Sequence, residues 1–287
     1  MNLFEIIKDM QLYITTRKQS ELKIGFVPTM GYLHEGHAAL MQRAREECDL
    51  VIISIFVNPL QFGPNEDLDQ YPKDFERDVT LARIHGVDAI FVPHSEEMYP
   101  EDEPGCQLSV TGRTGVLCGK SRPGHFDGVV TVLTKLFHII QPDRAYFGLK
   151  DAQQVAVVDD LIKTFNFPIE LVGCATVRED DGLALSSRNV NLSETEREQA
   201  PLLYQSLLSA KKSLESGSSI RHIKKALISQ LESIEIGHLD YVEILTYPKL
   251  KNVTSFEETI IIALAYQFEN ARLIDNIIIS ESEDHSE

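Results

Sequence analysis

The stretch FVPTMGYLHEGH, residues 26–37, joins an apolar run to a helical pattern and ends on two histidines. In a doubly wound α/β fold, ligands bind beyond the carboxyl ends of the strands, and the turn into a helix offers backbone N–H groups to a phosphate. Gly31 and Gly36 permit a ligand to approach the backbone closely, and His34 and His37 are three residues apart, so both can reach one anionic group. The stretch therefore predicts an anion-binding turn.

Two other interpretations of the histidine pair stay open at this point. The pair can be a helix-terminal or core feature without chemistry, or it can bind a metal ion. HEGH lacks the spacing of the HExxH zinc motif, and no third ligand is evident, which disfavours a metal site. The chain also lacks GxGxxG and GxxxxGK[ST], which argues against a dinucleotide-binding enzyme and a P-loop enzyme.

Outward from this stretch, nearly continuous apolar runs alternate with helical spacing as far as residue 177. Runs of this kind are typical of strands that are covered on both faces of a parallel sheet. The predicted strands are residues 23–29, 50–57, 88–92, 145–148 and 169–177, and the predicted helices are residues 37–47, 74–85, 129–140 and 151–165. This alternation predicts an α/β fold with a doubly wound, Rossmann-like parallel sheet over residues 1–177.

The pattern changes after residue 191. Ser193 and Glu196 form a capping-box pattern for a long helix to about residue 215, and a second helix is expected over residues 220–231. Three β-like runs follow, over residues 238–246, 259–266 and 272–280. We therefore predict a smaller α+β domain over residues 178–287, whose acidic end, ESEDHSE, is interpreted as a solvated, disordered terminus.

The composition disfavours several classes of function. The 287 residues carry 27 Lys and Arg against 44 Asp and Glu, a net charge of −17, so binding to nucleic acid through bulk charge is not expected. No apolar run approaches the roughly 18 residues of a membrane span, and the first residues lack the basic region of a signal peptide. The four cysteines are scattered without a CxxC pair, as in a reducing compartment. We expect a cytoplasmic protein with no nucleic-acid or membrane partner.

Five motifs, in order between residues 23 and 191, carry a family resemblance: FVPTMGYLHEGH, SIFVNPLQFGPNEDLDQYPK, RPGHFDGV, YFGLKDAQQ and REDDGLALSSRN. Together they resemble the pantothenate synthetase (pantoate–β-alanine ligase) family of the HIGH-motif nucleotidyltransferase superfamily. The resemblance implies AMP-forming, ATP-dependent ligation of (R)-pantoate and β-alanine to pantothenate through pantoyl adenylate, with release of pyrophosphate. It also implies Mg²⁺ and a homodimer.

The resemblance implies roles for individual residues as well. The catalytic residues would be His34 and His37, which hydrogen-bond the triphosphate, with His37 as the usual proton donor, together with Lys150 and Arg188. ATP would contact Met30, Gly31, His34, Gly36, His37, Gly148, Lys150, Asp151, Val177, Leu185, Ser186, Ser187 and Arg188. The 178–189 loop would be a mobile strip that closes over the phosphates. Pantoate and β-alanine would contact Asn58, Gln61, Arg122 and Gln154, and Asp78 would help to hold Mg²⁺, mainly through water.

Structural interpretations of these residues stay open beside the functional ones. Asn58 and Gln61 can be turn residues, and Asp151 with Gln154 can be a helix cap. Arg188 can be an exposed loop residue, and Asp78 can be an acid on the surface of a helix. Two rival functions also remain: a nucleotidyltransferase that stops at adenylate transfer, and a catalytically silent nucleotide-binding or regulatory module. VNPLQF and GLKDAQQ favour the ligase, because the resemblance makes them an acid-binding wall beside the nucleotide.

Overall fold

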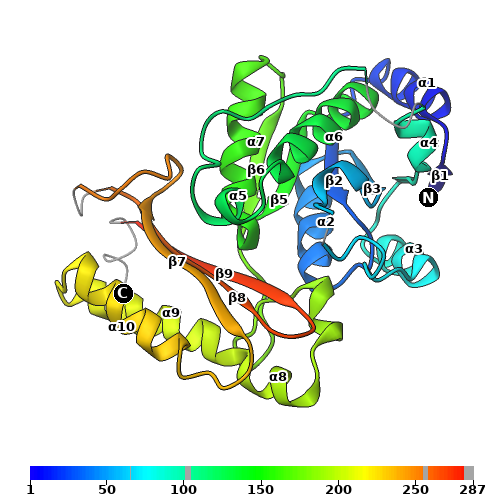
Figure 1. Cartoon of the computed structure of the whole chain (residues 1–287). Helices are drawn as coiled ribbons and strands as arrows, with labels where there is room; N and C mark the ends of the chain where they lie inside the picture. The colour runs from blue at the N-terminus through cyan, green and yellow to red at the C-terminus, as the bar shows by residue number, and fades with distance from the viewer. Residues whose placement is uncertain (65, 101–104, 255–257, 281–287) are drawn as a thin grey trace. The chain divides into compact units, whose positions relative to one another are not determined.

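The structure, a computed structural model, describes residues 1–64, 66–100, 105–254 and 258–280. The chain folds into two compact units, whose elements are labelled in Figure 1. The first unit comprises Met1–Thr111, Arg122–Leu149 and Val157–Ala175, and the second comprises Gly112–Ser121, Lys150–Ala156 and Thr176–Glu287.

The first unit is built on a six-stranded parallel sheet. Its strands are β1 (Asn2–Phe4), β2 (Ile24–Thr29), β3 (Leu50–Ile55), β4 (Ala89–Phe91), β5 (Arg144–Gly148) and β6 (Glu170–Cys174), in the spatial order β1-β4-β3-β2-β5-β6. From β2 the chain proceeds outward through β3 and β4 on one side, and through β5 and β6 on the other. The carboxyl end of β2 is therefore a topological switch point, where sheets of this kind bind ligands.

Helices cover both faces of this sheet, because successive residues of a strand point to opposite faces. On one face, Val27 joins a buried cluster with Met41 of α2 (Glu35–Glu47). On the other face, Phe26 packs edge-on against Phe137 of α6 (His125–Ile140), with ring centroids 6.5 Å apart. This unit also contains α1 (Ile7–Lys18), η1 (Pro59–Gln61), α3 (Phe75–Ile84), α4 (Ser95–Met98) and, from Val157, the greater part of α7 (Ala152–Thr164). The predicted α/β class with a doubly wound parallel sheet is confirmed.

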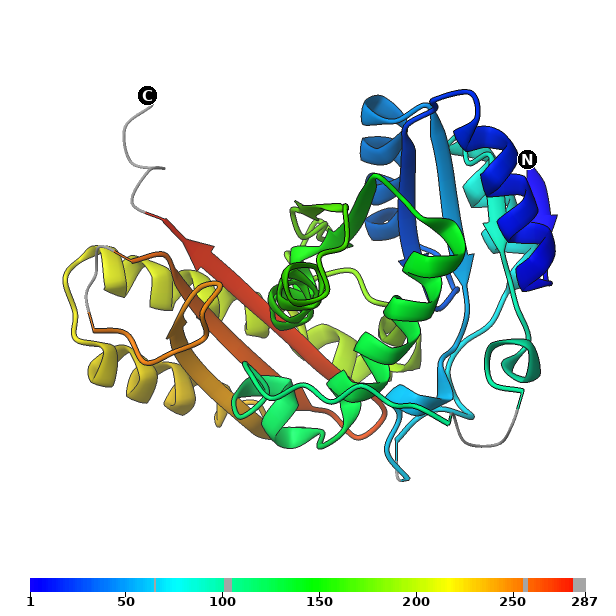
Figure 2. The same cartoon turned by 90° about the horizontal axis from the view of Figure 1, so that it is seen from above.

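The second unit is built on a three-stranded antiparallel sheet of β7 (His238–Thr246), β8 (Ile260–Gln267) and β9 (Arg272–Ile279). On one face, Ile262 and Leu264 of β8 belong to a core shared with α9 (Pro201–Glu215) and α10 (Ile220–Leu231), the yellow helices beside the strands in Figure 2. On the other face, the alternate residues Ile261 and Ala263 pack with α5 (Leu117–Ser121) and the start of α7 (Ala152–Thr164). The predicted smaller α+β unit is therefore present.

The units differ from the predicted division at residue 177 in two segments. Residues 112–121 and 150–156 belong to the second unit, although both precede residue 177. The reason is that Leu117, Ala152 and Ala156 complete the core on the face of the antiparallel sheet opposite α9 and α10. The main change from one unit to the other, between Ala175 and Thr176, lies two residues before the predicted boundary.

Some elements differ from the prediction. No element is predicted before residue 23, whereas the structure has β1 and α1 there. Only Met10 and Ile14 of α1 are buried, so the apolar periodicity of this helix is weak. The single helix predicted from residue 193 is divided into α8 (Glu194–Gln199) and α9 at Pro201, which cannot donate a helical hydrogen bond. The predicted disordered terminus, ESEDHSE, lies outside the described residues. Among those residues, no helix is both long enough and apolar enough to cross a membrane.

Candidate active site

The turn that follows β2 is held by Thr29 and requires a glycine. Thr29 Oγ1 donates to the carbonyl of Ser54 (2.7 Å) and accepts from the N–H of Gly31 (3.1 Å). Gly31 has a φ of +86°, and a Cβ at this position would lie 3.0 Å from both Asp78 and Ile55. The backbone and its surroundings therefore exclude other residues at Gly31.

Asp78, on α3, holds the next part of the turn. One carboxylate oxygen accepts from the N–H of Tyr32 (2.9 Å), and the other accepts from the N–H of Leu33 (2.6 Å). The residue is 1% exposed, so the interpretation of Asp78 as a surface helix acid is wrong. Burial raises the pKa of Asp78, and the two backbone N–H groups oppose that rise. Asp78 thus fixes the backbone of the turn at Tyr32 and Leu33.

The same contacts make Asp78 a poor direct ligand for Mg²⁺. Both of its oxygens already accept backbone hydrogens. In the part of the chain that the structure describes, no three His, Cys, Asp or Glu side chains gather to hold a metal ion. Mg²⁺ prefers an octahedral shell of oxygens and keeps several waters. Among the described residues, Asp78 is therefore not placed as a direct ligand, and no group of three such side chains is gathered for a resident magnesium ion.

His34 and His37 form a reciprocal cap at the start of α2. His34 is the N-cap residue, and its Nδ1 accepts from the N–H of Gly36 (3.1 Å), while Nδ1 of His37 accepts from the N–H of His34 (3.3 Å). The two ring centroids are 4.1 Å apart. Because each Nδ1 is an acceptor, the neutral rings carry their hydrogen on Nε2. The cap therefore presents two Nε2–H donors from one helical turn.

Asn58, predicted to contact pantoate, is buried at 1% exposure, and all of its polar atoms have partners within the protein. Its Oδ1 accepts from the Tyr99 hydroxyl (2.9 Å) and the N–H of Leu60 (3.3 Å). Its Nδ2 donates to the carbonyl of Gly128 (3.1 Å) and to Oε1 of Gln61 (3.2 Å). Because Leu60 N–H only donates and Gly128 C=O only accepts, the amide of Asn58 has one orientation. Asn58 positions Gln61.

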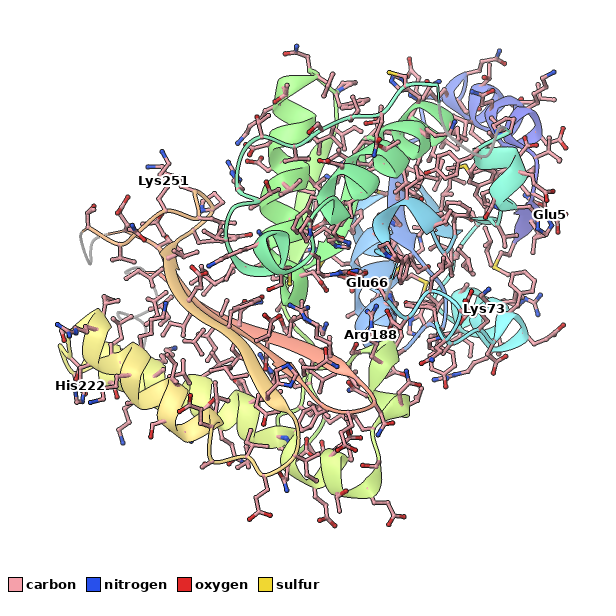
Figure 3. All side chains as sticks on the ribbon, in the orientation of Figure 1. Glu5, Glu66, Lys73, Arg188, His222 and Lys251 are labelled. Atoms are coloured by element: carbon pink, nitrogen blue, oxygen red, sulfur yellow. The ribbon has the colours of Figure 1, made fainter. Side chains whose placement is uncertain are left out.

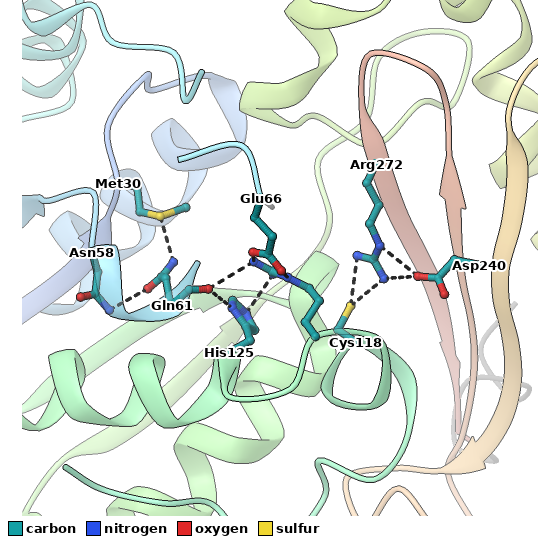
Figure 4. Close-up of polar contacts among 9 residues, drawn as sticks. Met30, Asn58, Gln61, Glu66, Cys118, His125, Asp240 and Arg272 are labelled. Atoms are coloured by element: carbon teal, nitrogen blue, oxygen red, sulfur yellow. Dashed lines mark hydrogen bonds and ion pairs between the residues drawn. The ribbon is translucent and has the colours of Figure 1, made fainter. Parts of the chain in front are cut away.

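Gln61 links the ends of β2 and β3, as Figure 4 shows. Its Oε1 accepts from Asn58, and its Nε2 lies 2.9 Å from the sulfur of Met30 in the turn after β2. The short helix η1, which carries Gln61, is seated against α6 at Gly128. A Cβ on Gly128 would lie 2.2 Å from the carbonyl oxygen of Leu60, so only glycine allows this contact.

Arg122, predicted to bind the acid substrates, is paired within the first unit. Its guanidinium donates to both carboxylate oxygens of Glu66 and to the backbone carbonyl of Gln61. Burial raises the pKa of Glu66, but Arg122 outweighs this effect, and the pKa lies below its usual value. Arg122 Nη1 also meets Nε2 of His125 (3.2 Å), and His125 Nδ1 meets the carbonyl of Gln61 (2.8 Å). Because a guanidinium N–H can only donate and a carbonyl can only accept, these contacts use Nε2 of His125 as an acceptor and Nδ1 as a donor.

Sequence reasoning assigned no role to Glu66, His125 or Tyr99. Glu66 and His125 lie inside quoted motifs, and the i, i+3 spacing of Arg122 and His125 at the start of a helix was an available signal. Tyr99 lies outside every motif and is 41 residues from its partner Asn58, so no local pattern could identify it.

The segment GLKD begins with Gly148 at the end of β5 and continues as η2 (Leu149–Asp151), of which Lys150 and Asp151 belong to the second unit. The ammonium group of Lys150 lies 3.7 Å from the carboxylate of Asp151. The backbone carbonyl of Lys150 accepts from the side chain of Asn276 (2.9 Å). In α7, Gln154 is half-buried, whereas Gln153 is buried and bonded to backbone groups of residues 113–119.

The loop of residues 177–189 is a tight hairpin followed by η3 (Ser187–Asn191). The N–H of Leu185 donates to the carbonyl of Val177 (3.0 Å), and Arg178 and Ala184 form an isolated antiparallel bridge. Ser186 is the N-cap of η3, and its hydroxyl accepts from the N–H of Arg188 (3.3 Å). Figure 3 labels Arg188 on this segment.

Ion pairs hold this hairpin on its own unit. Arg197 of α8 donates to Glu179 and Asp181, at 2.6 Å each. Arg178 donates to Asp275 of β9. The predicted mobility of the loop stays a prediction, but its base is anchored at three carboxylates.

The chain matches the model of the pantoate–β-alanine ligase family over residues 2–278. It is 56% identical over 278 residues to a pantothenate synthetase of Halalkalibacterium halodurans, covering 96% of this chain and 98% of the relative. It is 56% identical over 286 residues to the enzyme of Geobacillus thermodenitrificans, covering 99% of each. The crystal structure of pantothenate synthetase from Thermus thermophilus aligns with a TM-score of 0.90 at 44% identity, covering 96% of this chain and 99% of that one.

A further solved structure, the pantoate–β-alanine ligase of Francisella tularensis in complex with β,γ-ATP and β-alanine, aligns with a TM-score of 0.79 at 35% identity, covering 97% of each chain. A doubly wound sheet with a paired-histidine turn at its switch point defines an α/β nucleotide-binding class. Within that class, the chain belongs to the pantoate–β-alanine ligase family. The predicted enzyme, an ATP-dependent ligase of pantoate and β-alanine, is confirmed, and the two rival functions are not supported.

Proposed function

We propose that the ligation proceeds through pantoyl adenylate. In the first step, a carboxylate oxygen of pantoate attacks the α-phosphorus of ATP, and pyrophosphate leaves. In the second step, the amine of β-alanine attacks the acyl carbon, loses a proton, and AMP leaves with the electrons of the broken acyl–oxygen bond. Both steps depend on positioning and on stabilising charge at phosphate oxygens, not on a covalent bond to the protein.

The observation that carries this proposal is the pair of Nε2–H donors of His34 and His37 at the switch point of the sheet. Negative charge grows on the phosphate oxygen that leaves the α-phosphorus, and hydrogen-bond donors that are already oriented stabilise it without reorganisation. The reciprocal cap fixes both rings before any ligand arrives. The complex of the Francisella tularensis ligase with an ATP analogue and β-alanine supports a nucleotide in this family's site.

Pantoate recognition is assigned to Gln61 and Gln154. Asn58 engages Oε1 of Gln61, so the Nε2 donor of Gln61 is the group directed toward Met30 and a ligand. A donor of this kind suits the hydroxyl and carboxylate oxygens of pantoate. Asn58 and Arg122 support pantoate recognition indirectly. Asn58 holds the side chain of Gln61, and Arg122 holds its backbone carbonyl.

Further ATP contacts are assigned to both units. In the first unit they involve the turn residues Met30, Gly31 and Gly36 and also Gly148. In the second unit, Lys150 and Arg188 add positive charge toward the phosphates, and Asp151 bonds the ribose hydroxyls. Arg188 can grip two phosphate oxygens at once. Val177, Leu185, Ser186 and Ser187 contribute the remaining contacts. The division into a binding domain and a C-terminal lid is part of this proposal.

Magnesium enters the proposal as part of the substrate, MgATP, because Mg²⁺ is commonly held by substrate phosphates and water, and the residues that the structure describes gather no group of three His, Cys, Asp or Glu side chains. A cytoplasmic location agrees with four cysteines that are all free thiols. The homodimer rests on the family resemblance, and sedimentation equilibrium tests it.

The test of the proposed route separates its two steps. With MgATP and D-pantoate but without β-alanine, the enzyme should release one pyrophosphate per active site and retain pantoyl adenylate. Addition of β-alanine should then release AMP and pantothenate in equal amounts. Pyrophosphate release that requires β-alanine, or AMP without pantothenate, would contradict the adenylate route.

A further inference from the structure

Two adjacent polar residues, Asp275 and Asn276, interrupt the apolar residues 273–279 of strand β9. They are 4% and 7% exposed, so both are buried. Their neighbours alternate between the two cores of the second unit: Leu273 and Ile277 pack toward α9 and α10, and Ile278 packs toward α5 and α7. Asp275 therefore points to the face of the helices, and Asn276 points to the opposite face.

On the helix face, Asp275 anchors the hairpin of residues 177–185. Arg178 donates to its two oxygens at 2.7 and 2.9 Å. The same guanidinium lies 3.5 Å from the ring centroid of Tyr204 on α9 and donates to the carbonyl of Gly182 (3.1 Å). A bidentate pair at this burial fixes the angle of the arginine as well as its position. The hairpin leads directly into Ser186, Ser187 and Arg188.

On the opposite face, Asn276 anchors η2. Its Nδ2 donates to the backbone carbonyl of Lys150 (2.9 Å). The backbone N–H of Asn276 donates to Oδ1 of Asp275 (2.8 Å), so the two anchors are also bonded to each other. Two neighbouring residues of β9, Asp275 and Asn276, thus hold two segments that are far apart in the sequence.

We propose that Asp275 and Asn276 are positioning residues for adenylate formation: they hold the backbone at Lys150 and the hairpin before Arg188 in one fixed register. The inference rests on the proposed function, which gives both cations to the phosphates. Two charges at a fixed separation match a triphosphate without reorganisation, whereas a displacement of about 1 Å can cost up to 100-fold in rate.

The first test compares Asn276→Ala with Asn270→Ala. Asn270 is a matched control, because its side chain also donates one hydrogen bond in this unit, to Glu196, and it contacts neither anchored segment. Pyrophosphate release with MgATP and pantoate, the reaction of supplied pantoyl adenylate with β-alanine, and the thermal midpoint are measured. Asn276→Ala should slow the first reaction at least about tenfold and the second less than twofold, while Asn270→Ala changes neither.

Equal rates for the two variants, or equal losses in both half-reactions of Asn276→Ala, would overturn the inference. Asp275→Asn should show the same selective loss, and if it does not fold, Asn276→Ala decides alone. Lys150→Met is measured in parallel. If Lys150→Met forms adenylate normally, the proposed function of Lys150 fails; if Lys150→Met is impaired and Asn276→Ala is not, only the positioning role fails.

Discussion

His34 and His37 each accept a backbone hydrogen of their own helical turn, through Nδ1 in both rings, at 3.1 and 3.3 Å. The contact does two things. It completes the N-terminus of α2, and it leaves Nε2 as the protonated nitrogen of each neutral ring. The observed capping role and the proposed catalytic role can be separated by substitution, because asparagine reproduces the Nδ1 acceptor and glutamine reproduces the Nε2 donor.

The first prediction uses this difference at His37. His37→Asn should keep the cap, with a thermal midpoint close to that of the wild type, but should lower turnover by about 100-fold, the usual cost of one charge-stabilising donor. His37→Gln should retain more turnover and less stability. Steady-state kinetics and thermal unfolding of both variants test this. If the asparagine variant is as active as the glutamine variant, Nε2 is not the group that acts.

A second prediction concerns Tyr99. Burial raises the pKa of its phenol, which therefore stays neutral and donates to Asn58, which in turn orients Gln61. Gln61→Ala should raise the KM for pantoate strongly, and Tyr99→Phe should raise it several-fold, with the KM for ATP unchanged in both. Tyr99→Phe should also lower the free energy of unfolding by about 1–2 kcal/mol.

Tyr146→Phe is the control for this prediction, since the Tyr146 hydroxyl is also buried but meets Cys48 and Glu47. An unchanged pantoate KM in Tyr99→Phe, or the same increase in Tyr146→Phe, would remove Tyr99 from pantoate recognition. An increase in the ATP KM of Gln61→Ala would show that the amide shapes more than the pantoate subsite.

A third prediction concerns Gly128. In an exposed helix, glycine to alanine stabilises by about 1 kcal/mol. Here the new methyl group would lie 2.2 Å from the carbonyl oxygen of Leu60, so η1 must shift. Gly128→Ala should therefore destabilise the chain by about 1–3 kcal/mol in urea unfolding and impair pantoate binding. Gly115→Ala, where a Cβ meets no atom within 4 Å, is the control. Stabilisation by Gly128→Ala would contradict the packing of η1 on α6.

A fourth prediction follows from Glu196. Burial raises the pKa of this carboxyl, but hydrogen bonds from Asn270 and Ser193 outweigh burial and lower the pKa to about 2. A pKa lower in the folded state than in the unfolded state adds stability above the unfolded value of about 4.3, and this stability is lost as the pH falls toward 2. Glu196→Gln should lower stability at pH 7 by about 2 kcal/mol and flatten its decline between pH 5 and 2. Exposed Glu198→Gln should leave that decline unchanged.

The parts of the fold that local sequence determines were predictable. The central strands are apolar runs because both faces are covered, and the turn at residues 26–37 lies next to its helix in the sequence. The boundaries between the two units were harder to predict from the sequence. Residues 112–121 and 150–156 join the second unit through contacts with strands that lie about 90 or more residues further along the chain.

The site divides in the same way. The motif histidines and Gln61 could be proposed as site residues from the sequence, but the groups that hold them could not. Asp78 bonds to Leu33 across 45 positions, and Arg178 bonds to Asp275 across 97. No spacing rule connects such pairs, because only the packing of distant elements brings them together. Asp78 was therefore interpreted as a metal ligand or a surface acid, and Asp275 received no role.

The last prediction tests the proposed role of Arg188 in the first half-reaction. A guanidinium can donate to two phosphate oxygens in one plane, whereas an ammonium acts as a point charge. Arg188→Lys should therefore slow pyrophosphate release from MgATP and pantoate by about tenfold or more, the cost of weakening an interaction formed as charge develops. Supplied pantoyl adenylate should react with β-alanine at nearly the wild-type rate, because that step has no departing pyrophosphate. Rapid-quench measurement of each half-reaction separates the two. Equal losses would mean that Arg188 maintains the structure of its unit throughout the cycle, and an unchanged first step would leave Arg188 without a role in adenylate formation.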